Sequence, residues 1–189
     1  NIYNVRDYGA LGNGSADDTD TIWATIVAAN AAGGGIVYFP PGDYRIKKKL
    51  GNPLNTLSTF DVDRMTKLTF LGDGYASKLK LEGDGQNRDW YMFYMHDGAS
   101  FIRFENLYFD GAEVTNADEQ THSVFFSGEN ADINGSGSHD CEVIDCYFGP
   151  INGDNVRFLG SATGGPTYNI RVHGNSIDSE GCRCGVAFQ

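Results

Sequence analysis

Apolar and polar residues alternate along most of the chain from about residue 67 onward, which is the pattern of short β-strands. Gly, Asn, Asp and Ser separate these segments, and the 3.6-residue period of a helix is absent there. Three segments align with one another: 101–111, 141–149 and 170–178. A second short strand is expected after each copy: 123–126, 155–158 and 185–188. An earlier, more degenerate coil is expected from three further segments: 67–74, 77–83 and 90–95.

The aligned copies share columns of residues expected to point inward. The first strands contribute Ile102/Cys141/Ile170, Phe104/Val143/Val172, Leu107/Cys146/Asn175 and Phe109/Phe148/Ile177. The second strands contribute Val124/Val156/Val186 and Phe126/Phe158/Phe188. The copies are offset by 39 and 29 residues, and such a repeat with two strands per copy predicts a solenoid. Equivalent residues would then stack about 4.8 Å apart in parallel sheets. Cysteine in these columns acts as a small apolar residue, and Asn175 is expected at a turn, bonded to backbone.

The segment 17–33 has a different pattern and predicts an α-helix. Ile22, Ile26 and Ala29 form one apolar stripe, with Trp23 and Val27 beside it. Asp17 or Asp18 can cap its start, Asp20 lies in its first turn, and Gly33 to Gly35 end it. A stack of coils has an open first face, so we expect this helix to cap it. The strand "IVYFP" (36–40) then enters the first coil, with a corner at Pro40, Pro41 and Gly42.

The stretches "VRDYGALGNGSADDTDTI" and "AANAAGGGIVYFPPGDYRI" resemble the N-terminal signature of the pectate-lyase-like superfamily. This resemblance implies an all-β solenoid, a right-handed parallel β-helix with an N-terminal capping α-helix. We expect one domain over residues 1–189, with the cap and first strand in 1–50 and the coils in 51–189. Because "GVAFQ" (185–189) reads as the middle of a coil, the coils are expected to continue beyond Gln189, so that this chain is truncated at its C-terminal end.

The charge composition limits the classes of molecule that the protein is expected to bind. The chain carries 14 basic and 25 acidic residues, a net charge of −11, and its one basic cluster is Lys47 to Lys49. Nucleic acid and membrane insertion are therefore not expected. The four cysteines, Cys141, Cys146, Cys182 and Cys184, lack zinc-ligand spacing and are expected to be buried free thiols. No metal site and no cofactor are expected.

The superfamily includes polysaccharide hydrolases, lyases and epimerases as well as phage tailspikes. The turn "INGDNVRF" (151–158) resembles the Gly-Asp-Asp turn of polygalacturonases, with Gly153 and Asp154 matching and Asn155 replacing the second Asp. One coil later, Asp178 and Glu180 are expected near Asp154. With Arg157 as a nearby cation, these residues are the candidate catalytic set: Asp154, Asp178, Glu180 and Arg157. The alternative is that the acidic residues are ordinary turn residues.

The epimerases of the superfamily carry an Asp-Pro-His-Glu run after the corresponding strand. Residues 157–160 read "RFLG" instead. Epimerisation of alginate is therefore not expected.

Outward columns supply candidate substrate-binding residues. Tyr108 over Tyr147 presents two aromatic rings on neighbouring coils, suited to sugar faces or to a subunit contact. Asn155 and His173 complete the candidate set. Arg103, Glu142 and Arg171 alternate in sign and predict an interstrand charge ladder.

The resulting hypothesis is a carbohydrate-active β-helix protein that binds and cleaves an acidic or bacterial surface polysaccharide, as hydrolase or lyase. The alternative is a non-catalytic tailspike or receptor-binding shaft, for which a homotrimer would be the natural assembly. Either protein is expected outside the cell or on a virion surface.

Overall fold

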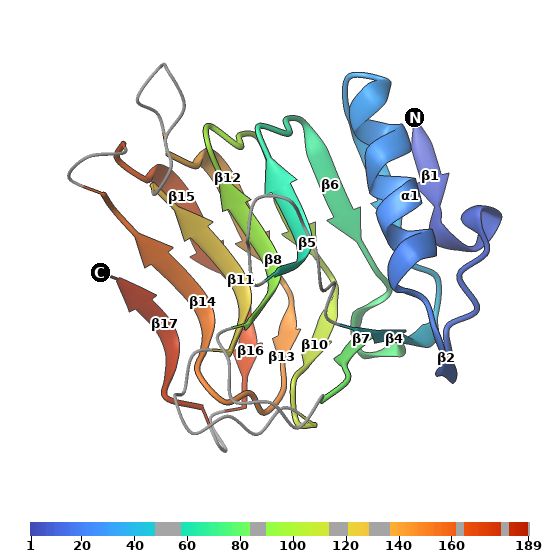
Figure 1. Ribbon diagram of the computed structural model, residues 1–189. Helices are drawn as coiled ribbons and strands as arrows, with labels where there is room; N and C mark the ends of the chain where they lie inside the picture. Colours follow the sequence, from blue (N-terminus) through green and yellow to red (C-terminus); the bar gives the residue numbers. More distant parts are fainter. Residues whose placement is uncertain are drawn as a thin grey trace.

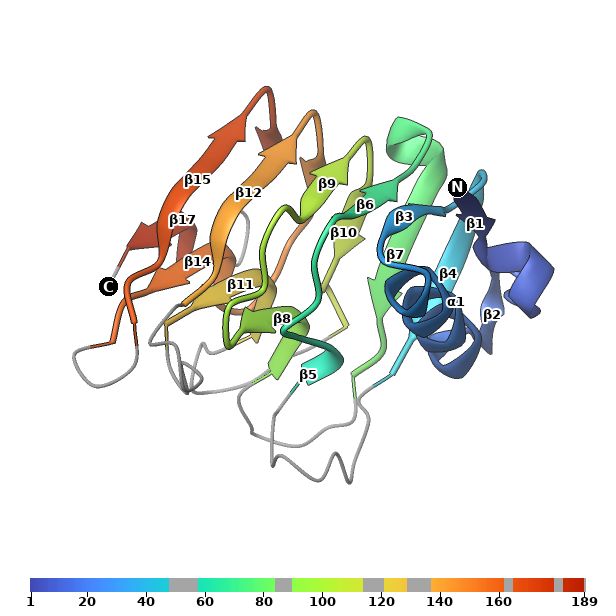
Figure 2. The same ribbon diagram turned by 90° about the horizontal axis from the view of Figure 1, so that it is seen from above.

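The computed structural model describes residues 1–47, 58–83, 90–113, 121–128, 137–161, 165–178 and 182–188 (Figure 1). Its strands form three sheets in which every pairing is parallel. Seen from above in Figure 2, successive coils lie side by side from α1 (Thr19–Ala31) to β17 (Cys184–Phe188). Glu180, Lys48 and Lys49 lie outside the described residues.

The first sheet consists of β1 (Ile2–Asn4), β3 (Gly35–Tyr38), β6 (Leu68–Leu71), β9 (Arg103–Glu105), β12 (His139–Ile144) and β15 (Tyr168–His173). The second consists of β2 (Asn13–Asp17), β4 (Gly42–Ile46), β7 (Ser77–Leu81), β10 (Tyr108–Asp110), β13 (Tyr147–Phe148) and β16 (Ser176–Ile177). The third consists of β5 (Ser58–Asp63), β8 (Trp90–His96), β11 (Thr121–Ser127), β14 (Asp154–Leu159) and β17. Two short 3₁₀-helices, η1 (Val5–Tyr8) and η2 (Gly74–Ala76), join strands of the first coils.

The predicted register is confirmed. Val143 pairs with both Phe104 and Val172, and Phe148 pairs with both Phe109 and Ile177. On the third sheet the columns of valine and phenylalanine expected from the repeat are also in register. The strands β1, β2, β4 and β5 were not predicted from the sequence, because they lie where no repeat copy was recognised.

Stacked aromatic rings fill the core along these columns. Phe126 and Phe158 lie parallel with ring centroids 5.5 Å apart, and Phe158 and Phe188 at 4.7 Å. Phe109 stacks on Phe148 at 4.9 Å in the same way. Parallel in-register strands place identical side chains directly above one another, so each phenylalanine of a column packs face to face on the next.

The helix α1 lies beside β1 and β3 at the N-terminal side of the stack (Figure 1). Its predicted apolar stripe of Ile22, Ile26 and Ala29 is fully buried, as expected. The two acidic residues at its start have different hydrogen-bond partners. Asp17 accepts hydrogen bonds from the backbone N–H and hydroxyl of Thr19, at 3.1 and 2.6 Å. Asp18 occupies the N-cap position, but its carboxylate accepts from the N–H groups of Leu11 and Gly12 instead.

The remaining predicted turns are found as expected. Pro40 and Pro41 lie in the corner between β3 and β4, whereas Gly42 is the first residue of β4. Asn175 accepts a hydrogen bond from the N–H of Cys146 and donates one to the carbonyl of Val143, both at 2.9 Å. Within the described residues, no helix is both long and apolar enough to cross a bilayer.

All four cysteines are free, but their environments differ. Cys141 and Cys146 are buried, and burial raises the pKa of each thiol to about 12. Cys182 is half-buried and Cys184 is exposed, so the expectation of four buried thiols is wrong for this pair. Both lie at the amino end of β17.

This difference predicts a selective reaction with thiol reagents. In the native protein Cys184 should react first with iodoacetamide, whereas Cys141 and Cys146 should react only after denaturation, because they are buried and protonated. Peptide mass spectrometry after timed labelling, with a urea-denatured sample as control, measures the order. Labelling of Cys146 at the rate of Cys184 would contradict the burial described.

Candidate functional site on the third sheet

Polar side chains gather at the amino ends of β11, β14 and β17. The parallel register places Asp154, the first residue of β14, opposite Cys184 on one side, and places His122 of β11 opposite Tyr91 of β8. The backbone N–H of Asp154 then donates to Nδ1 of His122 at 3.0 Å, which joins these neighbouring strands. The same alignment of Val124 with Val156 that the repeat predicts also places His122 beside Asp154, so the sequence contained this signal.

The carboxylate of Asp154 is fully buried and is held by Arg183. The guanidinium Nε donates to Oδ1 at 3.1 Å and Nη2 donates to Oδ2, a two-pronged arrangement. The Arg183 side chain keeps 30% of its surface exposed. A buried carboxylate needs such a partner because its ionised form is otherwise poorly solvated. Arg183 was not anticipated by the sequence analysis, which expected Asp178 and Glu180 near Asp154.

His122 is fully buried between two arginines. Burial lowers its pKa from the ordinary value of 6.5 to about 3, and the positive charges of Arg157 and Arg183 act in the same direction. Arg157 Nη1 lies 2.7 Å from Nε2, and Oδ2 of Asp154 lies 3.6 Å from Nδ1. Both ring nitrogens therefore face donors, the backbone N–H of Asp154 at Nδ1 and Arg157 at Nε2, but a neutral imidazole can accept a hydrogen bond at only one of them.

Aromatic rings line the same site. Tyr91 stacks on His122 with centroids 5.3 Å apart and planes 13° from parallel. The guanidinium of Arg157 lies 5.1 Å from the centroid of Phe125. Tyr91 and Arg157 are half-buried, so they, together with Arg183, are the members of this group that reach solvent. We call the group of Tyr91, His122, Asp154, Arg157 and Arg183 the His122 site.

The neutral state of His122 predicts a pH-dependent contribution to stability. Its folded pKa of about 3 lies below the ordinary 6.5, so the unfolded chain binds more protons between these values. Stability from this residue is therefore full above pH 6.5 and falls as the pH is lowered toward 3, by up to about 1.4 kcal/mol per pH unit. In His122→Gln this slope should be absent, so the gap in unfolding free energy between the two proteins should narrow from pH 7 to pH 4. Urea titrations at several pH values measure the gap, and parallel profiles would show that His122 does not titrate as described.

The structure separates the other predicted residues over the three sheets. Asn155 is buried, where it accepts from the hydroxyl of Ser123 at 3.2 Å and donates to Sγ of Cys182 at 3.5 Å. Asp178 is exposed and follows β16 in the second sheet. The catalytic and binding roles assigned from the sequence stay predictions, but Asp154 and Arg157 are the two catalytic candidates that share the His122 site.

Tyr108 and Tyr147 lie on the second sheet, paired in register. Tyr75, which is 62% exposed, contacts both rings, at 5.2 and 4.0 Å between centroids. The ammonium of Lys78 lies 4.8 Å from the Tyr108 centroid. The aromatic pair expected from the sequence is thus part of a three-tyrosine surface, which we call the tyrosine patch.

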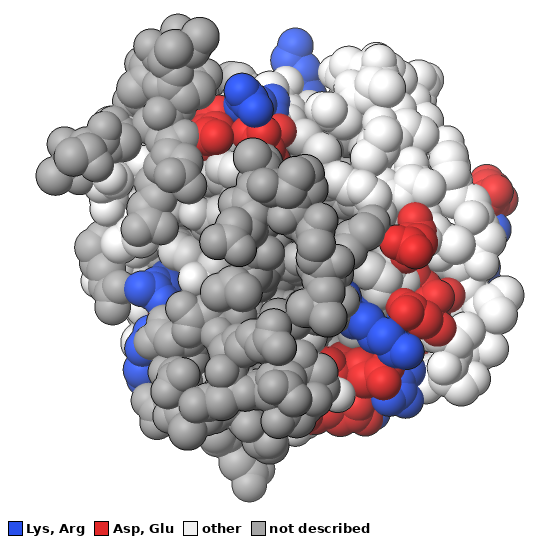
Figure 3. Space-filling model, in the orientation of Figure 1, with Lys and Arg blue, Asp and Glu red and all other residues white. Residues whose placement is uncertain are grey.

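His173 lies on the first sheet and belongs to the charge ladder. Glu142 pairs in register with Arg103 and Arg171, as predicted. Its carboxylate accepts from Arg103, and Nε2 of the exposed His173 lies 2.8 Å from it. A comparable mixture of signs covers β4 and β7, where Arg45 pairs with Glu82 (Figure 3). Charges in these surfaces are intermixed.

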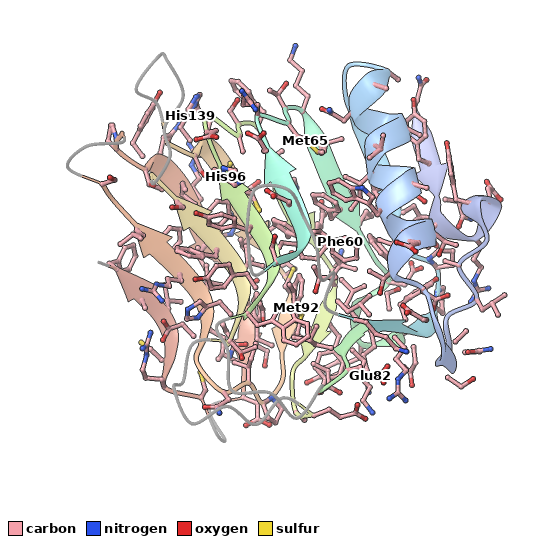
Figure 4. All side chains as sticks on the ribbon, viewed as in Figure 1. Phe60, Met65, Glu82, Met92, His96 and His139 are labelled. Atoms are coloured by element: carbon pink, nitrogen blue, oxygen red, sulfur yellow. The ribbon has the colours of Figure 1, made fainter. Side chains whose placement is uncertain are left out.

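A second polar cluster lies at the carboxyl ends of β5 and β8. His96 is buried there, with Nε2 2.5 Å from Oδ1 of Asp61 and Nδ1 3.4 Å from Oδ2 of Asp97. Figure 4 shows His96 in the upper part of the view, on the same side as Met65, which follows β5. Burial and the charge of Asp63 raise the pKa of Asp97, while that of His96 is raised by its carboxylate neighbours against the effect of burial. No metal ligands were expected from the sequence, and this group was not predicted because β5 was not recognised as a strand.

Three parallel sheets wound from successive coils define a parallel β-helix protein. The chain belongs to the family described as rhamnogalacturonase A/epimerase, pectate lyase-like, whose model matches residues 2–115. This finding confirms the resemblance seen in the N-terminal stretches.

Similar proteins come from Azotobacter vinelandii. Over 44 residues the chain is 64% identical to mannuronan C5-epimerase AlgE6 and 61% identical to alginate lyase 7, which is 23% of this chain and 5% of each relative. The solved A-module of mannuronan C-5 epimerase AlgE4 superposes with a TM-score of 0.67 at 26% identity, covering 93% of this chain and 45% of that one. The chain therefore spans less than half of that module.

Proposed function

We propose that this chain is part of a carbohydrate-active β-helix protein that binds an acidic polysaccharide at the His122 site and cleaves it by elimination. One observation carries the proposal: a neutral imidazole lies 2.7 Å from the guanidinium of Arg157, with a second arginine, Arg183, on the neighbouring carboxylate. Relatives named as a mannuronan epimerase and an alginate lyase support a uronate polymer as the substrate class.

The chemistry follows from the positions of these groups. Elimination requires removal of the proton on the carbon that bears the uronate carboxylate, with a cation to stabilise the enolate-like intermediate. Arg157 and Arg183 reach solvent and would bind that carboxylate. In the tautomer that carries its lone pair on Nε2, His122 would take this proton once the substrate carboxylate has drawn Arg157 away from Nε2. The C4–O4 bond then breaks, the leaving oxygen takes up a proton from water, and the new double bond between C4 and C5 gives an unsaturated uronate.

Hydrolysis is less well supported by this site. Glycoside hydrolases use two carboxyl groups roughly 5 to 9.5 Å apart, one on each side of the scissile bond. At the His122 site, within the described residues, Asp154 is buried against Arg183, and Asp178 lies on the second sheet. The role proposed for Asp154 is therefore to position Arg183.

The experiment uses the full-length parent protein. It would be incubated with alginate, pectate and bacterial capsular polysaccharides, with ultraviolet absorbance of unsaturated uronates, new reducing ends and proton NMR read together. Both absorbance and reducing ends are expected, and both should fall at least about 100-fold in His122→Gln, in line with loss of a general base. Arg157→Lys should also lose activity, because lysine cannot reproduce the planar guanidinium.

Controls separate the outcomes. Arg103→Lys, on the first sheet, should retain full activity because it lies in the charge ladder away from the His122 site. Reducing ends without absorbance would show hydrolysis and overturn the elimination step. Inversion at C5 seen by NMR without chain cleavage would show epimerisation, for which the Asp-Pro-His-Glu run is absent from this sequence.

A second candidate function is glycan binding by a non-catalytic shaft, and the tyrosine patch is the observation that favours it. Three neighbouring tyrosines beside Lys78 suit the face of an anionic sugar. This function would be supported if Tyr75→Ala lost polysaccharide binding, His122→Gln kept it, and no assay detected cleavage or epimerisation. A trimer in light scattering would accompany it, since a shaft of this kind is expected to assemble as a homotrimer.

We also propose that α1 caps the first coil and that the protein works outside the cell or on a virion surface, where such polysaccharides occur. The buried stripe of Ile22, Ile26 and Ala29 supports the cap. Replacing Ile26 by Asp should expose that end of the core and lower solubility, measurable by dye binding and light scattering.

A further inference from the structure

The cluster at the carboxyl ends of β5 and β8 is separate from the His122 site. His96 lies five positions after Tyr91 along β8, which is roughly 17 Å of extended strand. Asp63 ends β5 and pairs in register with His96, and Asp97 follows directly. One ligand atom from each of Asp63, His96 and Asp97 lies within 4.8 Å of the other two. The three side chains are 18%, 2% and 15% exposed, respectively.

Each of these side chains has a buried polar atom without a hydrogen bond to any part of the chain that the structure describes. Oδ1 of Asp63, Nδ1 of His96 and Oδ1 of Asp97 have no partner among the residues that the structure describes. Buried polar atoms in proteins almost always have a partner, and a bound ion can satisfy those that lack one within the protein. Three such atoms from two neighbouring strands converge here, so a single ion could satisfy all of them.

The remaining contacts orient the imidazole as in a metal site. Oδ1 of Asp61 lies 2.5 Å from Nε2 of His96 and accepts a hydrogen bond from this nitrogen. The neutral ring then carries its lone pair on Nδ1, which faces Asp97 at 3.4 Å. Histidine ligands of metals generally donate their other N–H to a carboxylate in this way, which fixes the tautomer.

We propose that Asp63, His96 and Asp97 bind a divalent cation of the zinc or manganese type, with Asp61 as the outer carboxylate that orients His96. An imidazole with two carboxylates suits these ions, whereas Ca²⁺ takes six to eight oxygen ligands. Ligand atoms around such an ion lie roughly 3 to 4 Å apart, so the three side chains need only a small contraction. The ion would join the ends of β5 and β8 at one corner of the coil.

The test is direct binding to the wild-type chain at neutral pH. After EDTA treatment and dialysis, Zn²⁺ and Mn²⁺ should each titrate as one site in calorimetry. At about 100-fold excess over Kd, the ion should raise Tm by about 5 to 10 °C. His96→Gln and Asp97→Asn should each weaken binding at least about 10-fold, and Asp61→Asn about 10- to 100-fold.

His139→Gln is the matched control. His139 also lies beside an aspartate, Asp140, at 2.9 Å, but it is 20% exposed and belongs to the first sheet. Its replacement should leave the affinity unchanged. Asp97→Asn keeps the shape of the side chain, so the variant should fold. Its circular dichroism spectrum checks this, and weaker metal binding can then be distinguished from loss of the folded structure.

Two results would overturn the proposal. One is that neither ion changes Tm and EDTA has no effect, while stability falls as the pH rises through the raised pKa of His96. That result would assign the cluster to an imidazolium paired with carboxylates, since a raised histidine pKa stabilises the fold below it. The other is equal loss of affinity in His139→Gln and His96→Gln, which would mean adventitious binding by surface histidines.

Discussion

Replacing Arg183 by methionine should lower the free energy of unfolding by about 3 kcal/mol or more, because it leaves a buried charge without its partner. The carboxylate affected is that of Asp154, which is fully buried and bound through two guanidinium nitrogens. The Arg183 side chain itself is 30% exposed, so its own loss of packing is the smaller part of the effect. Urea unfolding followed by circular dichroism measures the change.

A double variant identifies the cause. Asp154→Asn/Arg183→Met removes the buried charge together with its partner and should recover at least about half of the lost stability. Arg171→Met, at an exposed arginine of β15, should stay within about 0.5 kcal/mol of wild type. If Arg183→Met were as stable as Arg171→Met, the ion pair would not hold β14 to the segment before β17.

The second large effect is expected from Phe104→Ala, which should cost about 3 to 5 kcal/mol. Phe104 is fully buried where the three sheets meet. Its ring lies 4.8 Å from that of Phe70, 5.0 Å from Phe93 and 6.0 Å from Phe109. Each neighbour belongs to a different strand, so none can move into the cavity without shifting its own coil. The midpoint of thermal or urea unfolding reports the loss.

Matched variants define the origin of this loss. Phe104→Leu keeps most of the volume and should cost less than half as much as alanine. Phe101→Ala, three residues earlier, removes a ring that is 56% exposed and should change stability by no more than about 0.5 kcal/mol. A cost for Phe101→Ala as large as that for Phe104→Ala would mean that ring burial does not control stability here.

The regular features of the fold could be predicted because the same types of residue recur at equivalent positions along the sequence. The columns of valine and phenylalanine on the third sheet, and the pairing of Glu142 with Arg103 and Arg171, follow from aligning the copies. The stripe of Ile22, Ile26 and Ala29 marks α1 in the same manner, by its helical period. The coil containing β5 was missed because Ser58–Asp63 has no recognisable counterpart in the repeat.

The candidate site was predicted in part. Asp154 and Arg157 share one strand and could be selected from a single motif. Arg183 could not, because both Asp178 and Arg183 follow the same short strand, and the folded chain decides which of the two contacts Asp154. Asn155 was expected to bind substrate, but its side chain contacts Ser123 and Cys182 in a buried position.

The sequence by itself determined the parallel β-helix, its register and its family, because stacking repeats the same side chain at the same place in every coil. Only the tertiary structure decided which polar groups meet. It held His122 neutral between two arginines, and it brought His96 and Asp97 to Asp61 and Asp63 of the neighbouring coil. Burial sets the charge state of such groups, and burial depends on residues that are distant in sequence and adjacent only in the folded chain.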